Sequence, residues 1–186
     1  RAITGVHRIV ADTYNILSIC SGVAWLDYGV GLGLEWLGIT SRVVGYCERD
    51  SYAQAVLLAR MEDSSMEPAP VCDDLADIDQ RWRGCVDIVV AGIPCQPWSH
   101  AGTNEGIADE RWIWPDVLRA IRIVQPPVVF IENVPQVANA GEEAAPRLTD
   151  LTPLGFPGED AWADQDFCGG LGGTGLLTHH SNRWRS

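Results

Sequence analysis

Short apolar runs rich in β-branched residues alternate along this chain with longer segments of helical period. The candidate strands are residues 16–20, 43–47, 86–91 and 128–131, and each is too short for a buried helix. Strands separated by helical segments are typical of an α/β fold with a mainly parallel sheet. With 186 residues, 46% of them hydrophobic, the chain can bury one substantial core. We therefore expect a single compact α/β unit.

Helices are indicated between these strands. Ser51 is a favourable N-cap for a helix that carries Ala55, Val56 and Ala59. Pro115 suits the first turn of a second helix, which the Gln125-Pro126-Pro127 break then ends. The apolar face predicted for this second helix is formed by Trp114, Val117, Leu118, Ile121 and Val124. Towards the C-terminus the periodicity weakens, and the glycine-rich stretch 166–177 is predicted to be a loop.

Charge and cysteine usage restrict the possible partners. The formal net charge is −12 and all thirteen basic residues are arginine, so a generally basic surface is excluded and any contact with nucleic acid must be local. The six cysteines form no CxxC pair and no His/Cys cluster at zinc spacing, which predicts neither a metal site nor a disulfide framework. Without a membrane-spanning stretch or a secretory leader in the sequence, we expect a soluble cytoplasmic protein.

Polar groups follow each candidate strand, at the edge of a parallel sheet where ligands bind. Ser21-Gly22 is either a simple tight turn or part of a binding loop. Glu48 is either a solvated strand end or an acid that grips a ribose diol. The Asp73-Asp74 pair is either an exposed acidic turn or a source of a carboxylate for an adenine amino group. Their position in the predicted fold, more than their residue type, favours the binding interpretations.

Cys95 is the most specific of these residues. It lies directly beyond a predicted strand, and Pro94 and Pro97 restrict the backbone on either side of it. A thiolate fixed in this way can act as a nucleophile, whereas an inert buried thiol fits the position poorly. Glu132 ends another strand and is costly to bury without a partner, so we expect it to be exposed or held for a chemical task. Asn133 beside it can hold the turn.

These residues carry a resemblance. PCQPWS at 94–99, followed by IENV at 131–134, resembles the catalytic pair of motifs of the cytosine-C5 DNA methyltransferase family. The family's first, second, third, fifth and eighth motifs are resembled by LSICSGVAWLDYGV, GYCERD, CDDL, DERWIWPDVLRAI and HHSNRW. The resemblance covers most of residues 16–184. It implies a Rossmann-like, S-adenosylmethionine-dependent methyltransferase fold, incomplete at the C-terminus, with residues 1–14 as an extension and 15–186 as the catalytic domain.

The resemblance also implies a reaction. The Cys95 thiolate adds to C6 of a cytosine flipped out of double-stranded DNA, C5 takes the methyl group of S-adenosylmethionine, and loss of the C5 proton and of the cysteine completes the cycle. Glu132 holds N3 and the exocyclic amine of the cytosine. Arg183 contacts the cytosine or helps to hold the catalytic loop. The remaining substrate contacts implied by the motifs are Gln96, Pro97, Ser99, Asn133 and Val134.

For the cofactor, the resemblance implies that the turn at Ser21 and Gly22 surrounds methionine and that Glu48 binds the ribose hydroxyls. It implies that Asp74 and the backbone of Leu75 bind the adenine, whose face lies on the Trp114 region. The implied cofactor set also includes Cys20, Arg49 and Pro94. No metal and no membrane are implied.

The chain departs from the family pattern at several positions. Ser18 stands where an aspartate is usual, although serine also occurs in relatives, Cys20 replaces an aromatic residue, and Ala24-Trp25 replaces paired glycines. The Trp25 indole either blocks methionine or points into the core. Trp112 replaces a glycine, and Ser181 replaces the first arginine of the eighth motif.

Nothing after the eighth motif resembles the target-recognition domain, so the chain is either a fragment or is completed by a second polypeptide. Two other functions stay open beside DNA methylation. One is a non-catalytic remnant that binds a partner, and the other is methylation of cytosine in tRNA.

Overall fold

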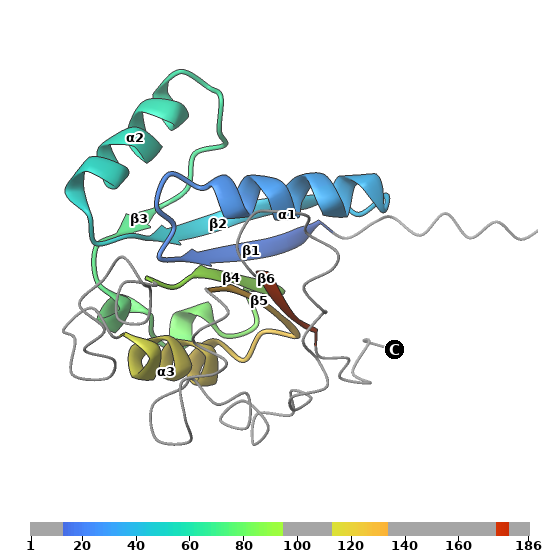
Figure 1. The fold of residues 1–186 in the computed structure, drawn as a ribbon, viewed down its shortest axis with the longest axis vertical. Helices are drawn as coiled ribbons and strands as arrows, with labels where there is room; N and C mark the ends of the chain where they lie inside the picture. Colours follow the sequence, from blue (N-terminus) through green and yellow to red (C-terminus); the bar gives the residue numbers. More distant parts are fainter. Residues whose placement is uncertain (1–12, 95–112, 134–173, 179–186) are drawn as a thin grey trace, which may run out of the picture.

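The computed structural model describes residues 13–94 and 113–133, together with the strand at 174–178 without its side chains. These residues form one six-stranded sheet in the order β3-β2-β1-β4-β5-β6 (Figure 1). The strands are β1 (Tyr14–Ile19), β2 (Ser41–Cys47), β3 (Val71–Cys72), β4 (Ile88–Gly92), β5 (Val128–Glu132) and β6 (Thr174–Thr178). The first five are parallel and β6 is antiparallel to β5. The mainly parallel α/β sheet expected from the sequence is confirmed.

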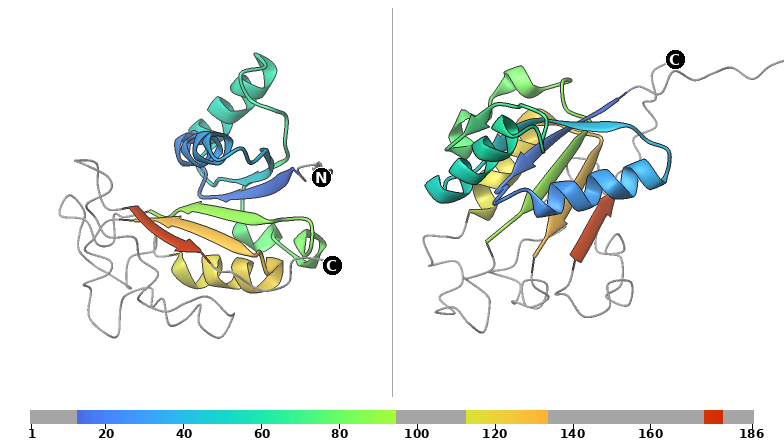
Figure 2. Two further views of the ribbon diagram at one scale, coloured as in Figure 1. Left: turned by 90° about the vertical axis from the view of Figure 1, so that its right-hand side faces the viewer. Right: turned by 90° about the horizontal axis from the view of Figure 1, so that it is seen from above.

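Helices cover both faces of the sheet (Figures 1 and 2). On one face lie α1 (Trp25–Trp36) and α2 (Ser51–Glu62), and on the other lies α3 (Trp114–Val124). The short 3-10 helices η1 (Leu75–Asp77) and η2 (Gln80–Trp82) pack beside α3. The described part of the protein is thus a three-layer α/β/α arrangement.

The α3 helix forms as its sequence predicts. Pro115 lies in its first turn, and all five residues of the predicted apolar face are buried. The helix ends at Gln125, whose φ of 51° is left-handed, directly before the two prolines. Its buried face meets Leu17 and Ile19 of β1 and Val89 of β4 in the largest core cluster.

The sequence did not predict α1, although it is as long as α2. Its sequence WLDYGVGLGLEW contains three glycines, and each costs about 1 kcal/mol of helix propensity relative to alanine. The helix nevertheless places Leu26, Val30 and Leu34 at i, i+4 and i+8 against Ile16 and Val90 of the sheet. Packing of this apolar stripe, rather than local propensity, stabilises the helix.

The α2 helix differs in detail from its prediction. Its N-cap is Asp50, whose Oδ1 accepts a hydrogen bond of 2.8 Å from the Ala53 backbone, and Ser51 is only its first residue. The buried residues are Ala53 and Leu57. The predicted apolar positions do not form the buried face, since Ala55 and Ala59 are exposed and Val56 is half-buried. Asp50 and Ser51 are both good caps, so residue preference alone could not place the boundary.

Part of the predicted C-terminal loop is a strand. Residues 174–178 pair in antiparallel fashion with β5, from Glu132 opposite Thr174 to Val128 opposite Thr178. The loop prediction was wrong for residues 174–177. Their glycine content favours a turn locally, but the backbone N–H and C=O groups at the edge of β5 form hydrogen bonds with this segment. The rest of the predicted loop lies outside the described residues.

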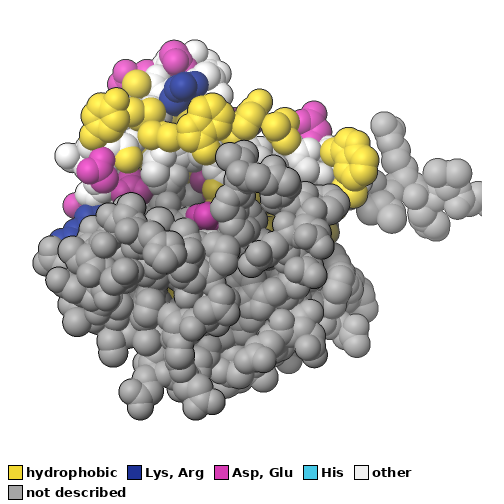
Figure 3. Space-filling model, viewed as in Figure 1, with side chains coloured by type: hydrophobic (Ala, Val, Ile, Leu, Met, Phe, Trp, Pro, Cys, Tyr) yellow, Lys and Arg dark blue, Asp and Glu magenta, His cyan; other side chains and the backbone are white. Residues whose placement is uncertain are grey.

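A band of exposed apolar side chains runs along α1 and α2 on the face away from the sheet (Figure 3). Trp25 is 71% exposed and Trp36 is 86% exposed. The interior position considered for Trp25 is therefore wrong, and its ring instead makes an edge contact with Tyr28 at the surface. A cavity of about 700 Å³ opens beside this band, between α1 and α2.

Candidate active site

The carboxyl ends of the five parallel strands are level with one another. Ile19 at the end of β1 pairs with Cys47 on one side and with Ala91 on the other. Cys47 pairs with Cys72, and Ala91 pairs with Ile131. The chain order reverses between β1 and β4, which is the point in such a sheet where ligands bind. The polar residues that follow these strands are therefore brought to a single edge.

The turn between β1 and α1 has an unusual backbone. Cys20, Gly22 and Ala24 have left-handed φ values of 52°, 53° and 64°. Two of these three residues are not glycine, so the turn is strained and must be held by its surroundings. The Ser21 N–H donates to the Cys47 carbonyl at 3.2 Å, and the Ala24 N–H donates to the Ser21 carbonyl at 2.8 Å. No heavy atom lies within 4 Å of the place where Gly22 would carry a Cβ, so this side of the turn is open.

Glu48, directly after β2, is tied to this turn. Its Oε2 accepts a hydrogen bond from the Gly22 N–H at 2.6 Å, and its Oε1 accepts one from the Asp50 N–H at 2.7 Å. The side chain is half-buried, so these two bonds fix the direction of the carboxylate. Each carboxylate oxygen can accept a further hydrogen bond, so a ligand diol can still be bound. Arg49 beside it is exposed.

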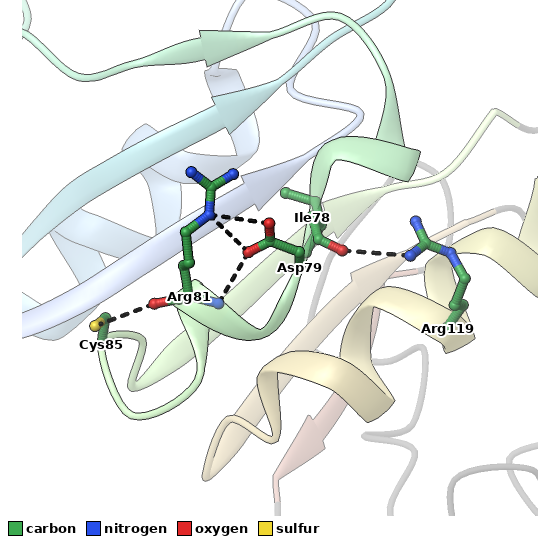
Figure 4. A network of polar contacts seen from close by, with 5 residues as sticks. All are labelled: Ile78, Asp79, Arg81, Cys85 and Arg119. Atoms are coloured by element: carbon green, nitrogen blue, oxygen red, sulfur yellow. Dashed lines mark hydrogen bonds and ion pairs between the residues drawn. The ribbon is translucent and has the colours of Figure 1, made fainter.

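The segment after β3 is held by an arginine whose role no sequence motif indicates. Asp74 caps η1 through its Oδ1, which accepts from the Ala76 N–H at 2.8 Å. Arg119 of α3 donates to the carbonyl of Leu75. It also donates, at 3.3 Å, to the carbonyl of Ile78 (Figure 4). Arg119 is half-buried while Arg122 of the same helix is exposed, and nothing in the sequence separates the two.

The ends of β4 and β5 lie side by side. The Ile93 N–H donates to the Glu132 carbonyl at 3.3 Å, and Gly92 pairs with Glu132 in the ladder. The chain therefore reaches Pro94, the residue before Cys95, directly beside the end of β5. Burial raises the pKa of the half-buried Glu132 carboxyl, which favours its protonated form. Asn133 next to it is buried.

A buried polar cluster that was not predicted from the sequence lies beneath the β1–α1 turn. The hydroxyl oxygen of Ser18 lies 2.8 Å from that of Ser21 and 2.9 Å from Oδ2 of Asp27. All three residues are at most 8% exposed. Burial raises the pKa of Asp27 to about 6. The one indication in the sequence is that Asp27 lies in an apolar, glycine-rich run after the first strand. The sequence does not show which residues it contacts.

Comparison with known proteins identifies the family. A profile described as C-5 cytosine-specific DNA methylase matches residues 14–156. The chain belongs to the C-5 cytosine-specific DNA methylase family. The Type II methyltransferase M.PspPI of Psychrobacter sp. is 33% identical over 148 residues, which are 77% of this chain and 33% of that protein. The Type II methylase M.HgiEI of Herpetosiphon aurantiacus is 49% identical over 108 residues, which are 57% of this chain and 23% of that protein.

A solved structure agrees with the fold. A mutant DNMT2 of Spodoptera frugiperda superposes with a TM-score of 0.53 and 16% identity, covering 78% of this chain and 42% of that one. The chain spans about a third or less of the length of M.PspPI and M.HgiEI.

The family's first motif is altered here in a way that the structure relates to Asp27. Ser18 occupies the position at which the motif usually has an aspartate, and the Asp27 carboxyl lies within hydrogen-bond distance of the Ser18 hydroxyl. A carboxyl group is thus present next to position 18, although it comes from α1 instead of β1.

The structure brings together one part of the predicted methylase site. Glu132 is the last residue of β5. The predicted residues that directly follow the ends of parallel strands are Cys20, Ser21, Gly22, Glu48, Arg49, Asp74, Leu75, Pro94 and Asn133. Trp114 is buried at the start of α3, in the core cluster against which Leu75 also packs. Outside the described residues lie Cys95, Gln96, Pro97, Ser99, Val134 and Arg183. The ligand contacts assigned to both groups stay predictions, as does the division of the chain at residue 14.

Within residues 13–94 and 113–133, no group of three His, Cys, Asp or Glu side chains is arranged to hold a metal ion. The cysteines described there, at 20, 47, 72 and 85, are free thiols. No helix in the described part of the chain is long and apolar enough to cross a membrane.

Proposed function

We propose that this chain forms the cofactor-binding and catalytic region of a DNA cytosine-C5 methyltransferase that uses S-adenosylmethionine. One observation carries the proposal most strongly. The described residues of the first, second and third motifs and of the catalytic pair lie at or directly after five level strand ends, around the point where the order of the sheet reverses. Residues that bind one cofactor and one base must lie close together, and this arrangement provides that.

The cofactor is bound by residues of three neighbouring strand ends. The left-handed turn at Gly22 offers an open surface to the methionine part, and the fixed Glu48 carboxylate accepts from the ribose hydroxyls. Asp74 and the Leu75 backbone, anchored through Arg119, bind the adenine. The Trp114 region and Pro94 border the adenine face, with Cys20 and Arg49 alongside. When bound, the cofactor supplies a methyl group on a sulfonium sulfur.

The cytosine is bound next to the ends of β4 and β5. Cys95 is proposed as the nucleophile that adds to C6, and Glu132 as the group that holds N3 and the exocyclic amine. The raised pKa of Glu132 supports this second role, because a protonated carboxyl can share its proton with N3. Further substrate contacts are proposed for Gln96, Pro97, Ser99, Asn133, Val134 and Arg183.

Double-stranded DNA is the proposed substrate, and a second chain is proposed to supply target recognition. The net charge of −12 favours recognition of the DNA by a separate chain, because strong phosphate binding requires basic side chains. The exposed apolar band along α1 and α2 supports a protein contact, since bands of this kind on soluble proteins mark interaction surfaces. The free thiols support action in the cytoplasm.

Covalent trapping tests the proposed chemistry. Duplex DNA containing 5-fluorocytosine is incubated with the chain, its completing partner and S-adenosylmethionine, and the products are digested for mass spectrometry. We expect a nucleotide adduct on the peptide containing Cys95, because fluorine at C5 prevents the proton loss that precedes release of the cysteine.

The matched control is Cys95→Ser, which should form no adduct, while Cys85→Ser, which changes an exposed thiol, should form it normally. An adduct on another residue, or none with a folded and completed protein, would contradict the proposal. tRNA in place of DNA in the same assay distinguishes the two substrate classes.

A further inference from the structure

Three hydrogen-bond contacts between oxygen atoms connect α1, through the β1–α1 turn, to the end of β2. Asp27 Oδ2 lies 2.9 Å from the Ser18 hydroxyl, which lies 2.8 Å from the Ser21 hydroxyl. The Ser21 hydroxyl in turn lies 3.3 Å from the Cys47 carbonyl. The contacts therefore run from the first turn of α1, through β1 and the turn, to the end of β2.

The number of protons decides whether all three contacts can form together. Each contact needs one proton between its two oxygen atoms, and the Cys47 carbonyl has none to give. The two serine hydroxyls supply one proton each. The third must come from the Asp27 carboxyl, so the complete chain runs from Asp27 to Ser18, from Ser18 to Ser21, and from Ser21 to the Cys47 carbonyl.

Loss of the carboxyl proton breaks this chain. Ser18 then gives its proton to the Asp27 carboxylate, so the single Ser21 proton serves either Ser18 or the Cys47 carbonyl, but not both. Ser21 therefore keeps one side-chain link instead of two, beside the bond from its N–H to Cys47. The turn that carries Gly22 is thereby less firmly attached to β2.

The surroundings of Asp27 favour its neutral form. The residue is 4% exposed, and its Oδ1 has no hydrogen-bond partner among the described residues. Besides Asp27, the charged and titratable groups that line the adjoining cavity are Tyr28 of α1, Arg42 and Tyr46 of β2, Tyr52 and Arg60 of α2, and Glu67 after α2. Neither arginine forms an ion pair with Asp27 in the described structure. An unpaired carboxylate in this position is costly, whereas a neutral carboxyl is less so.

We propose that Asp27, in its protonated form, is a positioning residue that orders the β1–α1 turn for the cofactor, so that cofactor affinity falls as Asp27 loses its proton. The inference rests on the proposed function, because it assumes that this turn binds the cofactor. It adds a buried residue of the first motif to which no cofactor contact is assigned, and it makes the occupancy of the site sensitive to pH. The raised pKa of Asp27, about 6, places the change below neutral pH.

Calorimetric binding of S-adenosylhomocysteine to the full chain at pH 5.5 and pH 7.5 tests the proposal. The wild-type affinity should fall by about fivefold or more between the two pH values. Asp27→Asn should bind equally well at both, because the amide N–H donates to Ser18 regardless of pH. Glu35→Gln changes an exposed acid on the same helix and should behave like the wild type. Equal wild-type affinity at both pH values, or Asp27→Asn with the wild-type pH dependence, would overturn the proposal.

A second readout needs no cofactor. In NMR spectra of the free chain, the Gly22 amide signal should titrate together with the Asp27 carboxyl carbon in the wild type, and should not shift over this range in Asp27→Asn. A purely structural role for Asp27 predicts no such coupled titration. No cofactor binding by the wild type at any pH would overturn the proposed function, and the Gly22 signal then decides separately whether Asp27 orders the turn.

Discussion

The Gly22 N–H donates a hydrogen bond of 2.6 Å to Oε2 of Glu48, which joins the end of β2 to the turn after β1. The same carboxylate accepts from the Asp50 N–H, and Asp50 caps α2. Glu48 is thus held from two sides by backbone donors. It is a fixed acceptor next to an open turn, and hydrogen bonds to a charged group of this kind contribute about 1.5–3 kcal/mol each.

Ala24→Gly should stabilise the protein. Ala24 has a φ of 64°, a conformation that glycine adopts without the steric cost of about 1–2 kcal/mol that other residues bear. We expect the free energy of unfolding, measured by urea denaturation, to rise by about 1 kcal/mol. Ala55→Gly, at an exposed position inside α2, should lower it by about the same amount. If both variants are destabilised equally, the left-handed turn does not exist in solution.

Asp27→Asn should stabilise the protein above neutral pH. Burial raises the pKa of Asp27 from the ordinary 3.8 to about 6, so between these values the folded chain holds a proton that the unfolded chain has lost. Wild-type stability therefore falls as pH rises through this window, by up to about 3 kcal/mol. The variant lacks this loss. Urea denaturation of both proteins at pH 4, 5.5 and 7.5 should show a gap that widens with pH, and a constant gap would contradict the assignment.

Arg119→Ala should loosen the segment proposed to hold adenine. The guanidinium donates to two carbonyl groups around η1, and their loss should cost about 1–2 kcal/mol of stability. Amide hydrogen exchange should become faster at Ala76, whose N–H donates to Oδ1 of Asp74, the N-cap of η1. Arg122→Ala, an exposed change one helical turn further along, is the control and should leave the exchange unchanged. An unchanged exchange rate at Ala76 in Arg119→Ala would contradict the proposal that Arg119 anchors η1.

The sequence was informative where structure depends on local pattern. The four runs of β-branched residues became β1, β2, β4 and β5, although Val86 precedes β4, which begins at Ile88. The apolar face of α3 was readable because its residues recur at helical spacing. The alternation of strands and helices predicted a parallel sheet, which places the polar residues after each strand at one edge.

Features that depend on tertiary contacts could not be read in this way. The glycines of α1 concealed a helix that packing stabilises, and β6 forms through pairing with β5. Asp27 and Arg119 gain their roles from partners distant in sequence or hidden in the core, and no residue pattern indicates such partners. Trp25, which replaces a glycine of the family motif, lies at the surface because α1 turns that position outwards.

Calorimetric titration of S-adenosylmethionine into the purified chain tests the central claim most directly. We predict saturable binding by the wild type, loss of at least tenfold in affinity in Glu48→Ala, and unchanged affinity in Glu62→Ala, which removes an exposed acid at the end of α2. Circular dichroism of each variant verifies that it is folded. Absence of binding by a folded wild-type chain, or equal binding by Glu48→Ala, would contradict the assignment of this sheet edge as the cofactor site.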